Sequence, residues 1–265
     1  MTPFALEMRR NRSLLVALVI SLLAYGGIMG LMYPILKQSD DQMRAYMEMF
    51  PKEFLAAFGM TGSLADPGVF FTTYIASWMW PIMAAAAALI AGTRTVAVDL
   101  DRGFLDLPLS TGISRTRYLA TAIASQVLTM AVLATAAVLG LWGAAKLVGV
   151  DFDLGRFAVA GVLCFALGCA IAGPATLGSV LTLSRGVTSA IVGGTLFVMY
   201  AVFVVTGVSA DWAWIGPLTA WNHFPTTKVI DAGYLPVGDL ALFGAIAIGC
   251  WLGAIAAFRR RDLAA

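Results

Sequence analysis

The stretch FAVAGVLCFALGCAIAGPATLGSVL, residues 157–181, contains no charged side chain and is apolar along almost its whole length. A helix needs about 20 apolar residues to cross the roughly 30 Å hydrocarbon layer of a bilayer. A run of this length therefore predicts a membrane-spanning helix. It decides the fold class, and the rest of the chain is interpreted around it.

The composition of the whole chain agrees with a membrane protein. Of its 265 residues, 60% are hydrophobic and only 12% are charged, whereas an average soluble domain carries about 25% charged residues. So little charge excludes an ordinary soluble domain and a disordered chain. The net charge of +2 argues against a nucleic-acid partner.

Five further stretches are long and apolar enough to cross a bilayer. The six predicted spans are 13–36, 73–93, 118–148, 157–181, 188–208 and 237–258. The predicted fold class is an all-α integral membrane protein with six transmembrane helices in one transmembrane domain, residues 1–265. The first run is too long for the apolar part of a signal peptide, so we expect it to remain as the first span.

The placement of arginine predicts the orientation of the spans. One side carries eleven arginines and five acidic residues, a net charge of +6, and the other carries six basic and ten acidic residues, a net charge of −4. Because basic residues are enriched in cytoplasmic segments, we expect the arginine-rich side, with both termini, to be cytoplasmic. The predicted location is the plasma (inner) membrane of a bacterium, as a multi-pass protein in contact with the lipid bilayer.

Two segments are predicted on the outer side. In segment 37–72, Met43, Met47, Phe50 and Phe54 recur at helical spacing, which predicts an amphipathic helix bent at Pro51. Its apolar face either caps the spans or forms a lateral gate, and both interpretations stay open. Segment 209–236 combines three tryptophans with three prolines, which predicts a broken, re-entrant-like segment before the last helix.

Segment 94–117 is the most informative part of the predicted cytoplasmic side. Val96, Leu100 and Phe104 share one helix face, and Gly103 and Pro108 break that helix. The segment exposes apolar residues among charges, which is typical of a partner-binding surface. An interfacial helix that rests on lipid headgroups explains the same pattern equally well.

Motifs of catalysis are missing from the sequence. It contains no G-x-x-x-x-G-K-[ST] phosphate loop and no H-E-x-x-H zinc pattern, and its one histidine, His223, falls in an outer segment. Cys164, Cys169 and Cys250 lie in apolar runs without metal-site spacing, so we expect them to act as small hydrophobes. We therefore predict no catalytic residues, no metal site and no enzyme activity in this chain. No charged side chain falls clearly inside the hydrocarbon part of a span, since Lys146 lies near the end of its span. Proton-coupled carriers, in contrast, keep ionisable residues at membrane depth.

Four features together give the sequence a resemblance to the permease subunits of type-2 (ABC-2) ATP-binding cassette transporters. They are the basic stretch FALEMRRNRSLLVALVI (4–20), the segment VDLDRGFLDLPLSTGISRTRYL (98–119), the proline-rich outer segment before the last span, and the ending FRRRDL (258–263). The topology of the whole chain is similar to that family. The motifs cover about 40 residues.

The resemblance implies a function and partners for this chain. It implies a permease subunit that exports a hydrophobic or amphipathic compound, such as a drug or a lipid. ATP and Mg²⁺ would then bind two copies of a separate ATPase subunit, and a second permease subunit would complete a homodimer or heterodimer. The resemblance also implies that segment 94–117 is the coupling loop. The residues that would dock on the ATPase are Asp99, Asp101, Arg102, Gly103, Phe104, Leu105, Leu107 and Pro108.

Bulky and adaptable side chains in two spans are candidates for a substrate path. They are Trp78, Met79, Met83, Phe197 and Tyr200. For any one of them, a lipid-facing position or a place in the aromatic belt is the more common explanation. Three other functions stay open for the chain as a whole: a stand-alone carrier or channel, a membrane enzyme, and an assembly protein without transport activity.

Overall fold

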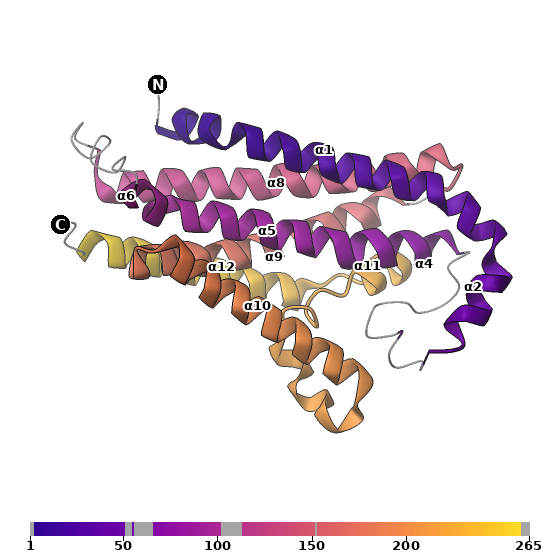
Figure 1. Cartoon of the computed structure of the whole chain (residues 1–265). Helices are drawn as coiled ribbons and strands as arrows, with labels where there is room; N and C mark the ends of the chain where they lie inside the picture. The colour runs from indigo at the N-terminus through magenta and orange to yellow at the C-terminus, as the bar shows by residue number, and fades with distance from the viewer. Residues whose placement is uncertain (1–2, 51–54, 56–65, 102–112, 152, 261–265) are drawn as a thin grey trace.

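The chain folds into a bundle of long helices. The structure, a computed structural model, describes residues 3–50, 55, 66–101, 113–151 and 153–260 (Figure 1). Six helices among these residues are long and apolar enough to cross a membrane. They are α1 (Pro3–Gln38), α5 (Trp80–Thr93) with its continuation η2 (Arg94–Val98), α8 (Arg115–Leu147), α9 (Leu154–Thr182), α10 (Arg185–Val208) and α12 (Val237–Arg260).

Shorter helices connect these six. They are α2 (Asp40–Met47), α4 (Pro67–Phe71), the π-helix η1 (Thr72–Met79), α6 (Asp99–Asp101), the 3-10 helix η3 (Ala210–Leu218) and α11 (Thr226–Ala232). The described residues contain no β-strand. The prediction of an all-α fold with six spanning helices is therefore confirmed.

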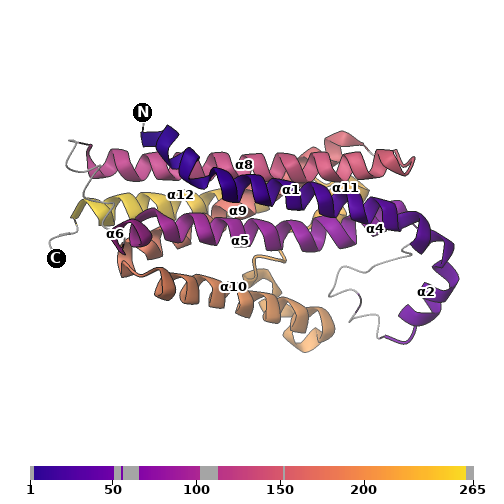
Figure 2. The ribbon, with the colours of Figure 1, turned by 45° about the horizontal axis from the view of Figure 1, so that its top comes forward.

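Helix α9 occupies the middle of the bundle. It packs against α5, α8, α10 and α12, and α1 lies along the outer side of α8. Both ends of the chain lie at the end of the bundle where α6 and the start of α8 are found, and α2 lies at the opposite end (Figure 1). Helix α10 leaves the bundle towards its C-terminal end, where η3 packs against it (Figures 1 and 2).

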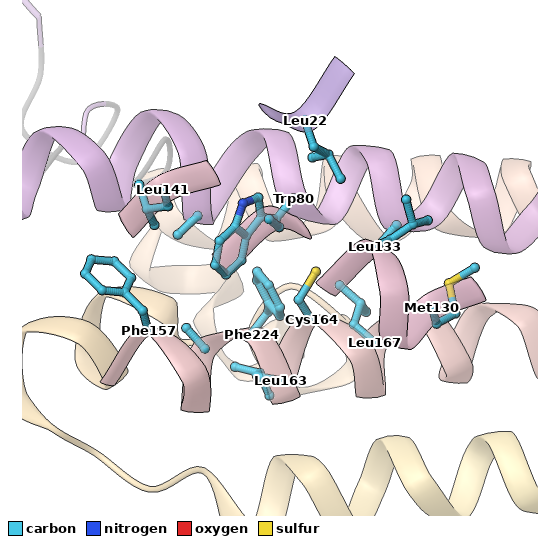
Figure 3. Packing of buried hydrophobic residues seen from close by; sticks show 14 of the residues in the cluster. Leu22, Trp80, Met130, Leu133, Leu141, Phe157, Leu163, Cys164, Leu167 and Phe224 are labelled. Atoms are coloured by element: carbon cyan, nitrogen blue, oxygen red, sulfur yellow. The ribbon is translucent and has the colours of Figure 1, made fainter. Parts of the chain in front are cut away.

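The core lies between α9 and its neighbours. Figure 3 shows Trp80 of α5 between Leu141 of α8 and Cys164 of α9, with Phe224 from the outer segment nearby. The Trp80 side chain is 1% exposed. Cys164 and Cys169 are buried, as expected of small hydrophobes. Because lipid is as apolar as these side chains, close packing rather than escape from water holds the spans together.

Glycines set the distance between α1 and α8. A Cβ atom added at Gly26 would lie 2.9 Å from the backbone oxygen of Gly140, and one added at Gly30 would lie 3.0 Å from the Cβ of Ala144. The Gly140 oxygen belongs to the backbone, so it has no freedom to move aside. Small residues at helix crossings allow this close approach in membranes.

The Gly26→Ala variant is expected to lose about 1–3 kcal/mol of unfolding free energy because the new methyl group forces α1 away from α8. Gly27→Ala is the matched control, since a Cβ at Gly27 meets no atom within 4 Å. Unfolding of both purified variants by sodium dodecyl sulfate measures the difference. Equal stability of the two variants would show that α1 and α8 do not pack through Gly26.

The predicted broken segment before the last helix is present. Residues 209–236 form η3, a turn and the short helix α11. His223 ties this segment to α12: its Nδ1 lies 2.7 Å from the Asp239 carboxylate, and its Nε2 lies 2.8 Å from the carbonyl oxygen of Pro217. The hydroxyl oxygens of Thr226 and of Ser77 in η1 lie 2.8 Å apart and share a hydrogen bond. The segment is therefore folded back and fastened at two points to the bundle.

Two other connections between the long helices are partly described. Helix α2 begins the amphipathic segment 37–72, whereas Pro51, Phe54 and Phe58 lie outside the described residues. Lys146, at the end of α8, forms a salt bridge with Asp151. The hydrogen bond from Lys146 and its positive charge hold the pKa of Asp151 below its usual value. This basic residue thus lies at the end of its span, as predicted.

Candidate functional site

The helix of the second span does not stop where the sequence suggested. We predicted an end at Thr93 and a loop with a separate short helix after Arg94. Instead the chain continues from α5 through η2 and α6 to Asp101. The reason is packing: Val96 of η2 is buried against Leu119 of α8, Val180 of α9 and the C-terminal part of α12.

Ser179 of α9 holds the π-helical segment in place. Its hydroxyl oxygen accepts hydrogen bonds from the backbone N–H groups of Val96 (3.3 Å) and Ala97 (3.0 Å). The same hydroxyl donates to the carbonyl oxygen of Thr93 at 3.2 Å. Ser179 is completely buried. In a π-helix the backbone hydrogen bonds do not follow the α-helical pattern. Here the hydroxyl of Ser179, which belongs to another helix, forms hydrogen bonds with three backbone groups in and next to η2.

A buried glutamine joins the same segment to two further helices. Gln126 of α8 donates through Nε2 to the hydroxyl of Thr95 at 2.7 Å, and its Oε1 accepts from the hydroxyl of Thr176 in α9 at 3.0 Å. The side chains of all three residues are buried. Buried polar groups need such partners, because leaving one unpaired in an apolar environment is costly. η2 is therefore fixed to both α8 and α9.

Asp99, one of the predicted docking residues, points into the bundle. It is only 3% exposed, and its carboxylate accepts a hydrogen bond from the hydroxyl of Tyr118. That hydroxyl also lies 2.9 Å from the carbonyl oxygen of Thr95, and the Tyr118 ring packs near Phe258 of α12. A carboxylate held in this way anchors the start of the segment.

The other predicted docking residues are described only in part. Asp101 is the last residue of α6. Arg102, Gly103, Phe104, Leu105, Leu107 and Pro108 lie outside the described residues. We call the segment that leads to the predicted coupling loop, residues 94–101 of η2 and α6, the root of that loop. The docking role of the six residues beyond it stays a prediction.

The predicted substrate-path residues belong to three helices, η1, α5 and α10. Trp78 and Met79 belong to η1, and Met83 of α5 borders the core near Trp80. Phe197 is 72% exposed on α10, whereas Tyr200 packs against Phe203 and Trp221. An apolar cavity of the described bundle lies elsewhere, between α9, α10 and α12.

Ser179, Gln126 and Tyr118 were not among the site residues predicted from the sequence. A signal for the first two was present, because a serine and a glutamine stand inside otherwise apolar spans, where polar side chains seek partners. The partners themselves are far apart in the chain, with Ser179 and Ala97 separated by 82 positions. Only the packing of α5 against α9 shows that they meet.

The described residues do not bring metal-binding side chains together. Among them, no three His, Cys, Asp or Glu side chains lie close enough together to hold a metal ion. What the described arrangement provides is a helix bundle in which η2, just before Asp99, is hydrogen-bonded to α8 and α9.

One family model matches this sequence over residues 1–259, and its description is "Multidrug efflux system permease Rv1217c, C-terminal domain". No curated protein matches the chain. The match covers nearly the whole sequence and agrees with the bundle of six apolar helices. The chain therefore belongs to the family of the C-terminal domain of the multidrug efflux system permease Rv1217c.

Proposed function

We propose that this chain is the membrane-spanning permease subunit of an ATP-driven efflux transporter whose ATP hydrolysis takes place on a separate subunit. The family supports the coarser part, a membrane permease for efflux. The finer part rests on one observation: the residues that lead to the predicted coupling loop, in η2 and α6, are hydrogen-bonded to α8 and α9. A loop with such a root can carry a force into the membrane.

The contacts of the root indicate how the force would travel. An ATPase that binds around Phe104 would move residues 102–112, and η2 would transmit that movement to α9 through Ser179 and to α8 through Gln126 and Tyr118. Because these bonds fix the backbone of η2, the segment η2 and the helices α8 and α9 would shift as one unit rather than bend locally. A shift between two discrete packings of a helix bundle is a common switching mechanism.

The partners follow from the same proposal. Two ATPase copies would carry ATP and Mg²⁺, and a second permease subunit would complete the pathway as a homodimer or heterodimer. The exposed apolar surface of α10, which includes Phe197, Val198 and Val205, supports such a membrane partner. In this arrangement both termini and the coupling loop face the cytoplasm, and the exported compound is hydrophobic or amphipathic.

The test is purification of the tagged chain from its native membranes in mild detergent. We expect a soluble subunit with a phosphate-binding loop to co-purify, together with ATP hydrolysis that vanadate inhibits. A chain that purifies alone, without associated hydrolysis, and that drives flux from an ion gradient would overturn the proposal and favour a stand-alone carrier or channel.

A further inference from the structure

An apolar cavity lies between α9, α10 and α12. Its volume is about 410 Å³, which falls in the range of about 300–1,000 Å³ typical of sites for drug-sized ligands. Leu167 and Ile171 of α9 and Phe243 of α12 form its closed floor, and all three are at least 95% buried. The cavity therefore has a buried floor and lies within one chain.

The mouth of the cavity opens on the apolar side of the bundle. Leu181, Ile191 and Ile246 line it and are exposed. They belong to three helices that are each long and apolar enough to span a membrane. A ligand would therefore enter sideways from the hydrocarbon layer, and only a lipid-soluble molecule can take that route.

The described wall of the cavity contains no charged side chain. Its hydroxyl groups already have partners: those of Thr182 and Thr188 lie 2.8 Å apart, and that of Thr195 donates to the carbonyl oxygen of Ile191 at 2.8 Å. A charged ligand would lose its hydration here without compensation. The wall therefore selects for an uncharged ligand held by packing alone.

Pro174 shapes the wall that faces this space. It lies inside α9 and lines the cavity, and proline has no N–H to donate to the carbonyl one turn earlier. The helix around Pro174 thus lacks one of its bonds, which favours a bend or local adjustment. Ala170 and Gly178, one turn before and one turn after Pro174, are small residues that also line the cavity.

We propose that this cavity binds an uncharged lipophilic small molecule that enters from the bilayer. The inference deepens the proposed function and rests on it in taking that molecule to be of the class that the transporter exports. The site lies within one chain and needs neither the ATPase nor a second subunit. It is also separate from the side chains of Met83, Phe197 and Tyr200, which do not line it.

Photolabelling of the purified full chain with benzophenone, an uncharged lipophilic probe, tests this site. We expect labelling to saturate and to map by mass spectrometry to α9, α10 and α12. Ile246→Trp at the mouth and Ala170→Phe at the floor are each expected to reduce saturable labelling at least fivefold. Leu252→Trp is the matched control on α12, because Leu252 is 62% exposed and does not line the cavity, and it should change labelling less than twofold.

Several outcomes would overturn the inference. One is labelling that rises without saturation and spreads over exposed faces such as Ile20 and Ile28 of α1. Another is saturable labelling that neither cavity variant reduces while both elute as monodisperse protein. A third is a bound phospholipid that benzophenone does not displace but that the Ile246→Trp substitution removes. The occupant of the cavity would then be an acyl chain.

The experiment separates this inference from the proposed function. Binding is measured on this chain alone, so saturable labelling without a co-purifying ATPase would retain the cavity site and overturn the ATP-driven mechanism. If a normal ATPase complex forms but neither cavity variant reduces labelling, the ATP-driven mechanism would be retained and the cavity site would be overturned. If both the cavity site and the ATP-driven mechanism hold, export of benzophenone-like compounds should fall in the Ile246→Trp variant and stay unchanged in the Leu252→Trp variant.

Discussion

Replacing Phe104 with aspartate is expected to abolish export and to release the partner ATPase from the membrane fraction. An aromatic side chain buried at the centre of an interface commonly contributes about 2 kcal/mol or more to binding, which corresponds to roughly 30-fold weaker association. The new carboxylate adds the cost of burying an unpaired charge. ATPase co-purification and export in membrane vesicles are the two measurements.

Two control variants keep this prediction specific. Phe104→Leu preserves an apolar side chain and should retain most of both activities, and Thr111→Asp adds the same charge at a polar position of the same segment. If Phe104→Asp binds the ATPase and exports normally, segment 94–117 is not the coupling element and rests on lipid instead. If all three variants lose export equally, the segment tolerates no change and the docking role of Phe104 is wrong.

The Ser179→Val variant is expected to lower stability by removing three hydrogen bonds at once. The hydroxyl of Ser179 forms hydrogen bonds with backbone groups of Thr93, Val96 and Ala97. Valine leaves these three buried groups without that partner. A single interhelical hydrogen bond in a membrane protein averages only about 0.6 kcal/mol. Because three groups lose their bonds to Ser179 together, we expect a loss of about 2 kcal/mol of unfolding free energy.

The matched control is Thr135→Val on α8, whose hydroxyl is exposed and bonds only to the carbonyl of Ala131 in its own helix. Unfolding in sodium dodecyl sulfate measures both variants, and ATPase-driven export measures coupling. Ser179→Val should also lower export per ATP hydrolysed, because the root of the loop is loosened, whereas Thr135→Val should leave that ratio unchanged. Equal stability of the two variants would mean that Ser179 does not hold η2.

Much of the fold was predictable because crossing a bilayer imposes a simple requirement on sequence. About 20 apolar residues are needed for each span, and the six predicted stretches correspond to the six long helices that the structure describes. The prolines of residues 209–236 likewise predicted the break between η3 and α11, since proline interrupts a helix. These are local properties, and the neighbours of each segment do not alter them.

The orientation of the bundle in the membrane stays a prediction from arginine placement. So do the docking residues around Phe104. The structure adds that both ends of the chain and α6 lie at one end of the bundle (Figure 1). An even number of spans requires the two ends to be on one side, so this arrangement agrees with the predicted topology.

The number of spans and the presence of a charged segment after the second span were thus determined by the sequence alone, because hydropathy and charge act residue by residue. Only the tertiary structure decided that the second span continues through η2, that Asp99 points inward, and that Ser179 meets Ala97. It also decided that a cavity remains between α9, α10 and α12. The physical reason is that contacts and voids depend on how distant helices pack, and close packing at residues such as Gly26 and Gly140 sets the distance between them.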